Sequence, residues 1–163
     1  MERPGWRFPA RKGDLVFRGV AQLTLDSKGR LAVPAKFRDA LIARCSGHLV
    51  ITADSDHCLL VYPQPDWEPI EQKLMSLSSF NAQIRELQRR LVGYAEDVVM
   101  DATGRILVPP ALRQFAQLEK AAVLVGQGNK FELWNKNNWE GRMEQGGGFG
   151  AGGLPPELEG FSL

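Results

Sequence analysis

The sequence predicts an α+β fold built from two copies of one unit, which consists of a strand, a tight turn, a second strand and a helix. The first copy runs Asp-Ser-Lys-Gly-Arg-Leu-Ala-Val-Pro-Ala-Lys-Phe-Arg from Asp26, and the second runs Asp-Ala-Thr-Gly-Arg-Ile-Leu-Val-Pro-Pro-Ala-Leu-Arg from Asp101. Aspartate, glycine, arginine, an apolar run, proline and a second arginine recur at the same spacing. Two copies at so long a spacing indicate a duplication into paired half-domains, not a solenoid.

Each residue type in the unit favours one local structure. Aspartate at the first position and glycine at the fourth favour a tight type I turn. The branched and apolar run after the arginine favours a short strand. Pro34 and Pro109 cannot donate to a strand ladder but fit the first turn of a helix. We therefore predict a helix after each proline, the first extending to about Arg44.

The flanking sequence repeats the same plan. A strand is predicted over 17–25, before the first turn. The strands predicted over 49–53 and 58–62 form a hairpin, and their counterparts in the second copy are 122–125 and 131–134. Aligning Tyr62 with Trp134 also aligns Trp67 with Trp139, which extends the duplication beyond the signature.

Residues 66–94 are predicted to form an antiparallel helix pair, with Asp66 capping the first helix and Ser79 the second. One apolar stripe runs along each helix, and the second stripe includes Phe80. The favoured interpretation is that both stripes face the core. Part of this apolar surface could instead face a neighbouring subunit.

The charge of the chain is unevenly distributed. Its 163 residues carry a formal net charge of only +1. Residues 1–44, however, hold ten Lys/Arg against four Asp/Glu, so this part is +6 and the remainder is −5. Positive charge is therefore concentrated around the first turn, where a phosphate-binding face would need it. A solvated basic surface is the alternative interpretation.

Composition and motifs argue against several classes of protein. No apolar run approaches the roughly 20 residues that span a membrane, and two cysteines do not form a disulfide framework, so a cytoplasmic protein without a membrane partner is expected. A metal site could be assembled from Cys45, His48, His57 and Cys58. His57 and Cys58 are adjacent, however, and side chains of adjacent residues on a strand point to opposite faces. No motif activates a nucleophile. We therefore expect no enzyme, no cofactor, no metal site and no small-molecule substrate.

The predicted organisation has four parts. Residues 1–15 are expected to be a flexible N-terminal arm, 16–94 the first half with its helix pair, 95–144 the second half, and 145–163 a disordered Gly-rich tail. Val16 is a possible alternative start of the natural chain, which N-terminal sequencing would test.

The repeated turn supplies the candidate functional residues. Lys28 is predicted at the tip of the first turn and Arg30 just beyond it, where arginine can bind guanine edges and both cations can hold phosphates. Asp26 and Arg30 could also brace the turn, and this role is compatible with presenting the arginine. Thr103 replaces Lys28 in the second copy, so the first copy is predicted to be the main DNA-binding face and Arg105 structural or auxiliary. Candidate contacts to the DNA backbone, or plain surface charges, are Arg18, Lys36 and Arg38.

The two Asp-x-x-x-Arg signatures, Asp26 to Arg30 and Asp101 to Arg105, resemble those of the MraZ family of bacterial transcriptional regulators. Phe17-Arg18-Gly19 is similar to the usual opening of the family. The resemblance covers residues 16 to about 145. It implies that both half-domains form one AbrB-like swapped-hairpin β-barrel with flanking helices. It also implies a DNA-binding loop of Ser27, Lys28, Gly29 and Arg30, with Arg30 as the central base reader.

The resemblance also implies the partners. These are double-stranded DNA carrying direct repeats, upstream of the chain's own division and cell-wall operon, and further copies of the chain in a ring-shaped homo-oligomer. A nucleoid-associated location follows from this. A ring has a physical rationale, because one loop with one or two cations makes few phosphate contacts and an array gains effective concentration. The alternative is an antitoxin-type protein-binding module, because AbrB-like swapped hairpins also occur in antitoxins. The Gly-rich tail lacks the anchors that toxin binding would need.

Overall fold

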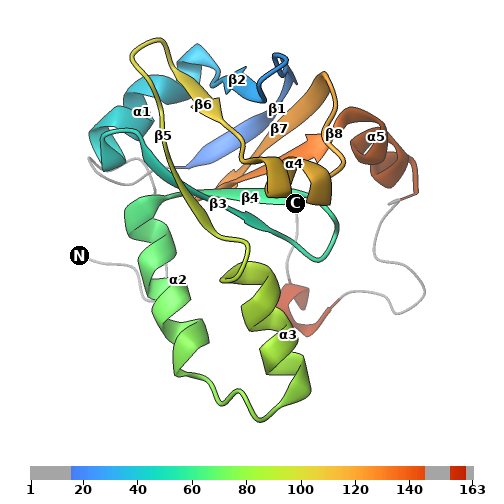
Figure 1. Cartoon of the computed structure of the whole chain (residues 1–163). Coiled ribbons are helices and arrows are strands. Elements are labelled where there is room, and N and C mark those ends of the chain that lie inside the picture. The colour runs from blue at the N-terminus through green and yellow to red at the C-terminus, as the bar shows by residue number, and fades with distance from the viewer. Residues whose placement is uncertain (1–15, 146–154, 161–163) are drawn as a thin grey trace.

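The computed structural model describes residues 16–145 and 155–160 and shows an antiparallel sheet with helices packed around it (Figure 1). The predicted α+β class is confirmed. The predicted N-terminal arm and the tail residues 146–154 and 161–163 lie outside the described residues. In the described part of the predicted tail, Gln145 ends a helix and Pro156–Leu158 form a short 3₁₀ helix.

The elements alternate along the chain as the duplication predicts. Within the described residues the strands are β1 (Phe17–Thr24), β2 (Arg30–Ala32), β3 (His48–Ala53), β4 (Leu59–Pro63), β5 (Glu96–Val99), β6 (Arg105–Leu107), β7 (Ala121–Gly128) and β8 (Phe131–Asn135). The helices are α1 (Ala35–Cys45), α2 (Gln64–Ser76), α3 (Ala82–Leu91), α4 (Pro110–Phe115) and α5 (Lys136–Gln145). Trp67 and Trp139 are both the fourth residue of their helices, α2 and α5, which agrees with the sequence alignment.

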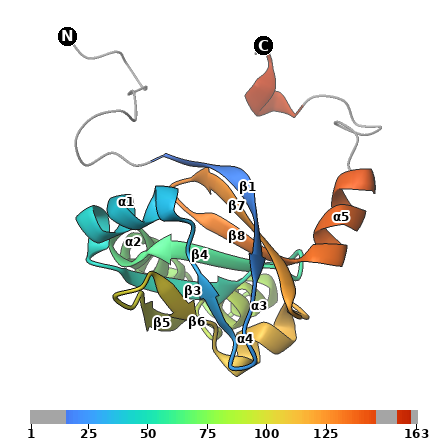
Figure 2. The same ribbon diagram turned by 90° about the horizontal axis from the view of Figure 1, so that it is seen from above.

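Strands pair between the two copies as well as within them. The larger sheet has the order β1-β7-β8-β4-β3-β5, and β2 and β6 form a separate two-stranded ribbon. The first strand of each copy pairs with the hairpin of the other copy: β1 of the first copy pairs with β7 of the second, and β5 of the second pairs with β3 of the first. The pairings β2–β6 and β4–β8 also join the copies (Figure 2). All these pairs are antiparallel, so the two copies are interleaved.

The implied β-barrel is not closed by hydrogen bonds. In the part of the chain that the structure describes, β1 and β5 are the edge strands of the larger sheet and do not pair with each other. The β2–β6 ribbon is likewise separate from that sheet. The sheet therefore remains open, because each edge strand pairs with only one neighbour.

Three phenylalanines form the centre of the core. The ring centroid of Phe131 on β8 lies 4.3 Å from that of Phe17 on β1 and 4.9 Å from that of Phe37 on α1. All three side chains are buried. Packing among them therefore links one strand and one helix of the first copy to a strand of the second.

The predicted helix caps are wrong. α2 begins at Gln64 after Pro63, and Asp66 lies inside its first turn, where one carboxylate oxygen accepts a 2.7 Å hydrogen bond from Arg44 Nη2. α3 is capped by Asn81, whose side-chain oxygen accepts hydrogen bonds from the backbone amides of Gln83 and Ile84. Asparagine caps as well as serine does, so residue preference alone could not select the site.

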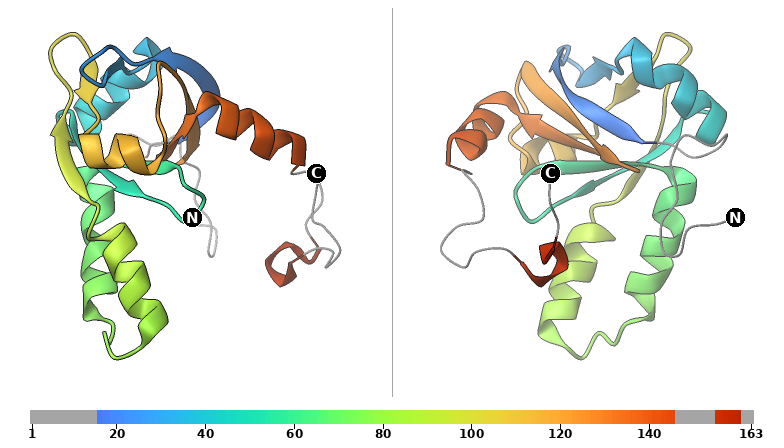
Figure 3. Two further views of the ribbon diagram at one scale, coloured as in Figure 1. Left: turned by 45° about the vertical axis from the view of Figure 1, so that its right-hand side comes forward. Right: turned by 180° about the vertical axis from the view of Figure 1, so that it is seen from behind.

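The α2–α3 pair extends away from the sheet, and the two helices meet at a loop at their far end (Figures 1 and 3). Trp67 and Leu74 of α2 are buried, as the core interpretation predicts. Phe80 in the connecting loop is instead 95% exposed, and α3 has no buried residue. The core interpretation is therefore wrong for this end of the pair. No helix among the described residues is both long and apolar enough to cross a membrane.

We expect Phe131→Ala to lower the free energy of unfolding by about 3–5 kcal/mol, because it leaves a cavity where strands and helices of both copies meet. Chemical denaturation would measure the change. Val20→Ala is the matched control, since Val20 is 54% exposed on β1, and it should change stability by less than about 0.5 kcal/mol. A Phe131→Ala protein as stable as the control would contradict the assigned core.

Candidate nucleic-acid interface

The first turn is organised by the carboxylate of Asp26. One carboxylate oxygen, Oδ1, accepts hydrogen bonds of 2.9 Å from the backbone amides of Lys28 and Arg30. The other, Oδ2, accepts a 2.8 Å hydrogen bond from the Arg30 side-chain Nε. The backbone closes the turn through a 3.0 Å hydrogen bond from the Gly29 amide to the Asp26 carbonyl. One side chain therefore shapes the loop and orients the arginine that follows it.

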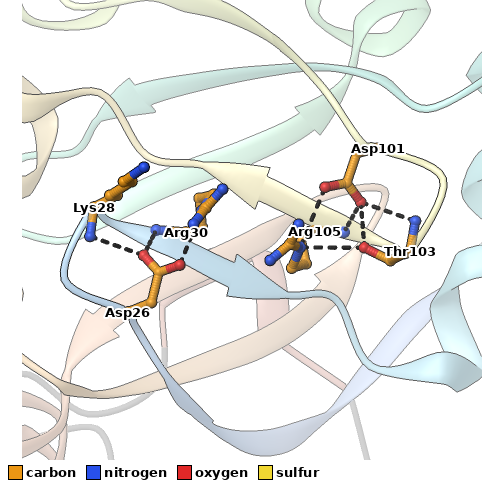
Figure 4. A network of polar contacts seen from close by, with 6 residues as sticks. All are labelled: Asp26, Lys28, Arg30, Asp101, Thr103 and Arg105. Carbon is orange, nitrogen blue, oxygen red and sulfur yellow. Dashed lines mark hydrogen bonds and ion pairs between the residues drawn. The ribbon is translucent and has the colours of Figure 1, made fainter.

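The second turn repeats this geometry. Asp101 Oδ1 accepts hydrogen bonds from the backbone amides of Thr103 and Arg105, both at 2.9 Å, and Oδ2 accepts one of 3.2 Å from Arg105 Nε. Thr103 adds a hydroxyl that donates to Asp101 and accepts from Arg105 Nε. In Figure 4 the two aspartates lie at opposite ends of the network, with Arg30 and Arg105 between them.

These hydrogen bonds stabilise the ionised form of each aspartate. The bond from the Arg30 backbone amide, reinforced by the Arg30 side chain, lowers the pKa of Asp26 to about 2. The Arg105 amide and the Thr103 hydroxyl lower the pKa of Asp101 to about 2. Both carboxylates are therefore charged at neutral pH. Arg30 and Arg105 nevertheless stay accessible, with 36% and 44% of their side-chain surfaces exposed.

Both arginines lie on the same face of the β2–β6 ribbon. Arg30 pairs with Leu107, Leu31 with Ile106, and Ala32 with Arg105. Because side chains of directly paired residues point to the same side, Leu31 and Ile106 share the buried face. Arg30 and Arg105 are diagonal neighbours on the outer face. The sequence prediction that Arg105 is auxiliary is untested, but the structure places it beside Arg30.

A helix arginine from the opposite copy covers each turn. Gly29 has a φ of +88°, and a Cβ added there would lie 2.5 Å from Cζ of Arg113 on α4. Gly104 has a φ of +82°, and a Cβ there would lie 2.3 Å from Nε of Arg38 on α1. Both glycines are buried. Glycine is therefore required twice over, for the backbone conformation and for the arginine packed against it.

The predicted cations fall into separate groups. Ser27 and Lys28 are exposed at the first turn, beside Arg30. Arg18 lies near the start of β1, about 25 Å along that strand from the turn at ~3.3 Å per residue. Lys36 is close to the start of β1 as well, since its Nζ lies 2.9 Å from the position of a Cβ on Gly19. Arg18 and Lys36 are thus not brought together with Arg30.

Arg38 and Arg113 have a structural contact that the sequence prediction missed. Arg38 Nε donates a 2.8 Å hydrogen bond to the Val33 carbonyl, and Arg113 Nε donates a 2.9 Å bond to the Val108 carbonyl. The signal was present in the sequence, because both arginines occupy the last position of the repeated signature. A contact between opposite copies could not be read from that position alone.

One cluster with metal-ligand atoms occurs among the described residues. Ligand atoms of Asp54, Cys58 and Glu132 lie within 4.8 Å of one another. Burial, together with the nearby carboxylates, raises the pKa of the Cys58 thiol, and metals bind the thiolate. Cys58 Sγ donates to Asp54, and Glu132 accepts a 2.9 Å hydrogen bond from Trp134 Nε1. These contacts account for the cluster.

The known proteins that are similar to this chain carry a single family name. A family model described as "MraZ protein, putative antitoxin-like" matches residues 16–90 and 91–146. Two proteins named "Transcriptional regulator MraZ" match the chain over their whole length. That of Nitrosospira multiformis is 64% identical over 148 residues, which cover 91% of this chain and 100% of the relative. That of Pseudomonas aeruginosa is 48% identical over 153 residues, with the same coverage.

We expect Asp26→Asn to lower the free energy of unfolding at pH 7, because a neutral amide oxygen accepts the backbone amides of Arg30 and Lys28 less strongly than the carboxylate does. The pKa of Asp26 is lowered in the folded state, so its contribution is present above about pH 4 and is lost as pH falls toward 2. The stability gap between wild type and Asp26→Asn should therefore narrow over this interval, as measured by chemical denaturation at each pH.

Asp39→Asn is the control for this pH series, since Asp39 is an exposed aspartate on α1, away from the turn. The comparison separates loss of the Asp26 carboxylate from loss of an acidic side chain on the surface. A gap for Asp26→Asn that persists unchanged at pH 2 would contradict the assigned role of the carboxylate.

Proposed function

The chain belongs to the MraZ family, and on that premise we propose that it is a sequence-specific DNA-binding transcriptional regulator. The observation that carries the proposal is the outer face of the β2–β6 ribbon, where Arg30 and Arg105 lie side by side, each oriented by its own aspartate. The proposal assigns no catalytic step to the chain.

A two-stranded ribbon fits the major groove of B-DNA, and arginine there binds the O6 and N7 atoms of guanine. Diagonal neighbours in an antiparallel pair are about 7–8 Å apart, which is about the distance between bases two steps apart at ~3.4 Å per step. Arg30 and Arg105 can therefore address two nearby bases from one ribbon. The exposed Lys28 and Ser27 are proposed to contact phosphates.

We propose that the interleaving of the two copies is the AbrB-like swapped-hairpin arrangement. Its support is the reciprocal pairing of β1 with β7 and of β5 with β3. The half-domains 16–94 and 95–144 are proposed on the same basis as units of duplication. Neither is expected to fold alone, because each leaves a strand unpaired.

The operator and the location are proposed from the family resemblance. The operator consists of direct repeats upstream of the chain's own division and cell-wall operon, and the protein is nucleoid-associated in the cytoplasm. Several copies in a ring would place equivalent ribbons on consecutive repeats, and each added copy would contribute phosphate contacts that one ribbon cannot supply.

The loop between α2 and α3 is proposed as part of the contact between copies. Phe80 is 95% exposed, and Met75 and Leu77 beside it are also exposed. The loop is nevertheless held in place: Arg85 Nη1 donates to the Ser79 carbonyl at 2.8 Å, and Ser78 Oγ accepts from the Phe80 amide. Burying a phenylalanine contributes about 1.5–3 kcal/mol, so this exposed side chain favours a partner.

The asymmetry of the chain favours a head-to-tail contact. Helix α5 is the counterpart of α2, but among the described residues the second copy has no counterpart of α3. We propose that this one-sided surface packs against a different face of the next copy. Heterologous contacts of this kind produce rings when the rotation closes.

An antitoxin-type protein-binding module is the second candidate, favoured by the description of the matching family model as antitoxin-like. It would bind a small protein toxin. Purification from the native organism decides between the two: a toxin bound at equal stoichiometry supports the second candidate, and specific DNA without a protein partner supports the first.

We expect Arg30→Ala to lower affinity for operator DNA by at least about tenfold, because a bidentate arginine–guanine contact contributes about 1–3 kcal/mol of discrimination and the loss recurs in every subunit of the array. Arg105→Ala should have an effect in the same direction. Fluorescence anisotropy with a fragment of the chain's own promoter, at fixed salt, would measure both.

Arg89→Ala is the matched control, because Arg89 is an exposed arginine on α3 with 68% of its side-chain surface accessible. It should bind operator like the wild type. Native mass spectrometry should find Arg30→Ala in the wild-type assembly. Wild-type affinity of Arg30→Ala would show that another face reads the DNA.

We expect Phe80→Ser to shift the oligomer toward smaller species at equal concentration, because it removes the exposed apolar side chain from the proposed contact. Its thermal unfolding should be unchanged as long as the chain is compared in the same oligomeric state. Met143→Ser, on the exposed part of α5, is the control. An unchanged mass distribution for Phe80→Ser, measured by native mass spectrometry, would remove this loop from the interface.

A further inference from the structure

Each Asp-x-x-x-Arg turn accepts a backbone hydrogen bond from the other copy. The Val33 amide of the first copy donates a 2.8 Å bond to the Gly104 carbonyl in the second turn. The Val33 carbonyl in turn accepts from Arg38 Nε, and the Arg38 guanidinium lies against Gly104. Arg38 thus contacts the turn of the opposite copy directly and also binds Val33, which donates a hydrogen bond to the same turn.

Arg113 and Val108 of the second copy make the matching contacts with the first turn. The Val108 amide of the second copy donates a 2.9 Å bond to the Gly29 carbonyl in the first turn. The Val108 carbonyl accepts from Arg113 Nε, and the Arg113 guanidinium lies against Gly29. Both arginines are only partly exposed, and both glycines are buried beneath them.

We propose that Arg113 and Arg38 are positioning residues, and that each holds the DNA-reading turn of the opposite copy. Arg113 fixes the turn that presents Lys28 and Arg30, and Arg38 fixes the turn that presents Arg105. The inference rests on the proposed function for its DNA readout. The contacts of each arginine with the opposite turn do not depend on any ligand.

The chemistry of the guanidinium explains why arginine occupies these positions. The guanidinium lies against a glycine, while Nε donates to a carbonyl at the end of the preceding strand. A lysine keeps the charge but offers neither the plane nor the fixed donor direction. The positioning role therefore depends on the shape of the guanidinium, whereas a contact with phosphate depends mainly on its charge.

A direct phosphate contact is the competing role, and salt dependence separates the two. Removing one phosphate contact reduces the slope of log affinity against log salt by about 1 per subunit engaged. A positioning residue leaves that slope unchanged. It lowers instead the ratio of operator affinity to nonspecific DNA affinity, because Arg30 or Arg105 is no longer held in one orientation.

The first experiment measures amide hydrogen exchange in the DNA-free protein for wild type, Arg113→Lys and Arg38→Lys. We expect Arg113→Lys to speed exchange at Lys28, Gly29 and Arg30 by about tenfold, with a smaller change at 103–105. Arg38→Lys should give the reverse pattern. The proposal would be overturned if amide exchange became faster in the turn of the copy that carries the substitution, in neither turn, or uniformly across the sheet.

The second experiment measures binding to the promoter fragment and to nonspecific duplex over a range of salt concentrations, for the same proteins. We expect each lysine variant to lose about tenfold in the specificity ratio with an unchanged salt slope. Arg89→Lys is the control and should match the wild type. A normal specificity ratio, or an Arg113→Ala slope that falls while Arg113→Lys keeps wild-type binding, would overturn the positioning role.

The two experiments also separate this inference from the proposed function. If the wild type shows no preference for the promoter fragment, the proposed function fails, and the exchange data still decide whether each arginine holds the opposite turn. If the wild type is specific and the cross-pattern of exchange is absent, the positioning role alone fails.

Discussion

Pairing between the copies is the constraint on which the rest of the structure depends. β1 and β5 each pair with the hairpin of the opposite copy, and β2 and β6 pair only with each other in the part of the chain that the structure describes. Backbone groups that lose such partners are costly to bury. The two Asp-x-x-x-Arg turns therefore cannot be placed independently, because the β2–β6 ladder sets the position of each relative to the other.

The turns combine rigidity with exposure. Each aspartate accepts two backbone amides and one arginine Nε, so the loop and its arginine are held by the same carboxylate. An exposed ion pair of this kind contributes little to stability. Its value is geometric, since it engages the arginine through Nε while more than a third of the side-chain surface stays exposed. A preorganised cation loses less conformational entropy when it binds a ligand.

The duplicated elements make the centre of the molecule symmetric, and its asymmetric features come from differences between the two copies. Lys28 in the first turn is replaced by Thr103 in the second, whose hydroxyl joins the hydrogen bonds around Arg105 instead of adding charge. Among the described residues, a second helix and the exposed Phe80 follow the first copy and have no counterpart after the second. A symmetric ribbon, which we propose reads DNA, and a one-sided surface, which we propose contacts another copy, can therefore coexist in one chain.

The sequence by itself determined the duplication, the position of each turn and the alternation of strands and helices around it, and it marked Asp26, Arg30, Asp101 and Arg105 as candidates, because residues a few positions apart decide these features. Only the tertiary structure decided that Arg38 and Arg113 cross to the opposite turns, that Arg105 lies beside Arg30 and that Phe80 is exposed. Those outcomes depend on which strands pair and how helices pack, and residues far apart in the chain meet only when the whole fold has formed.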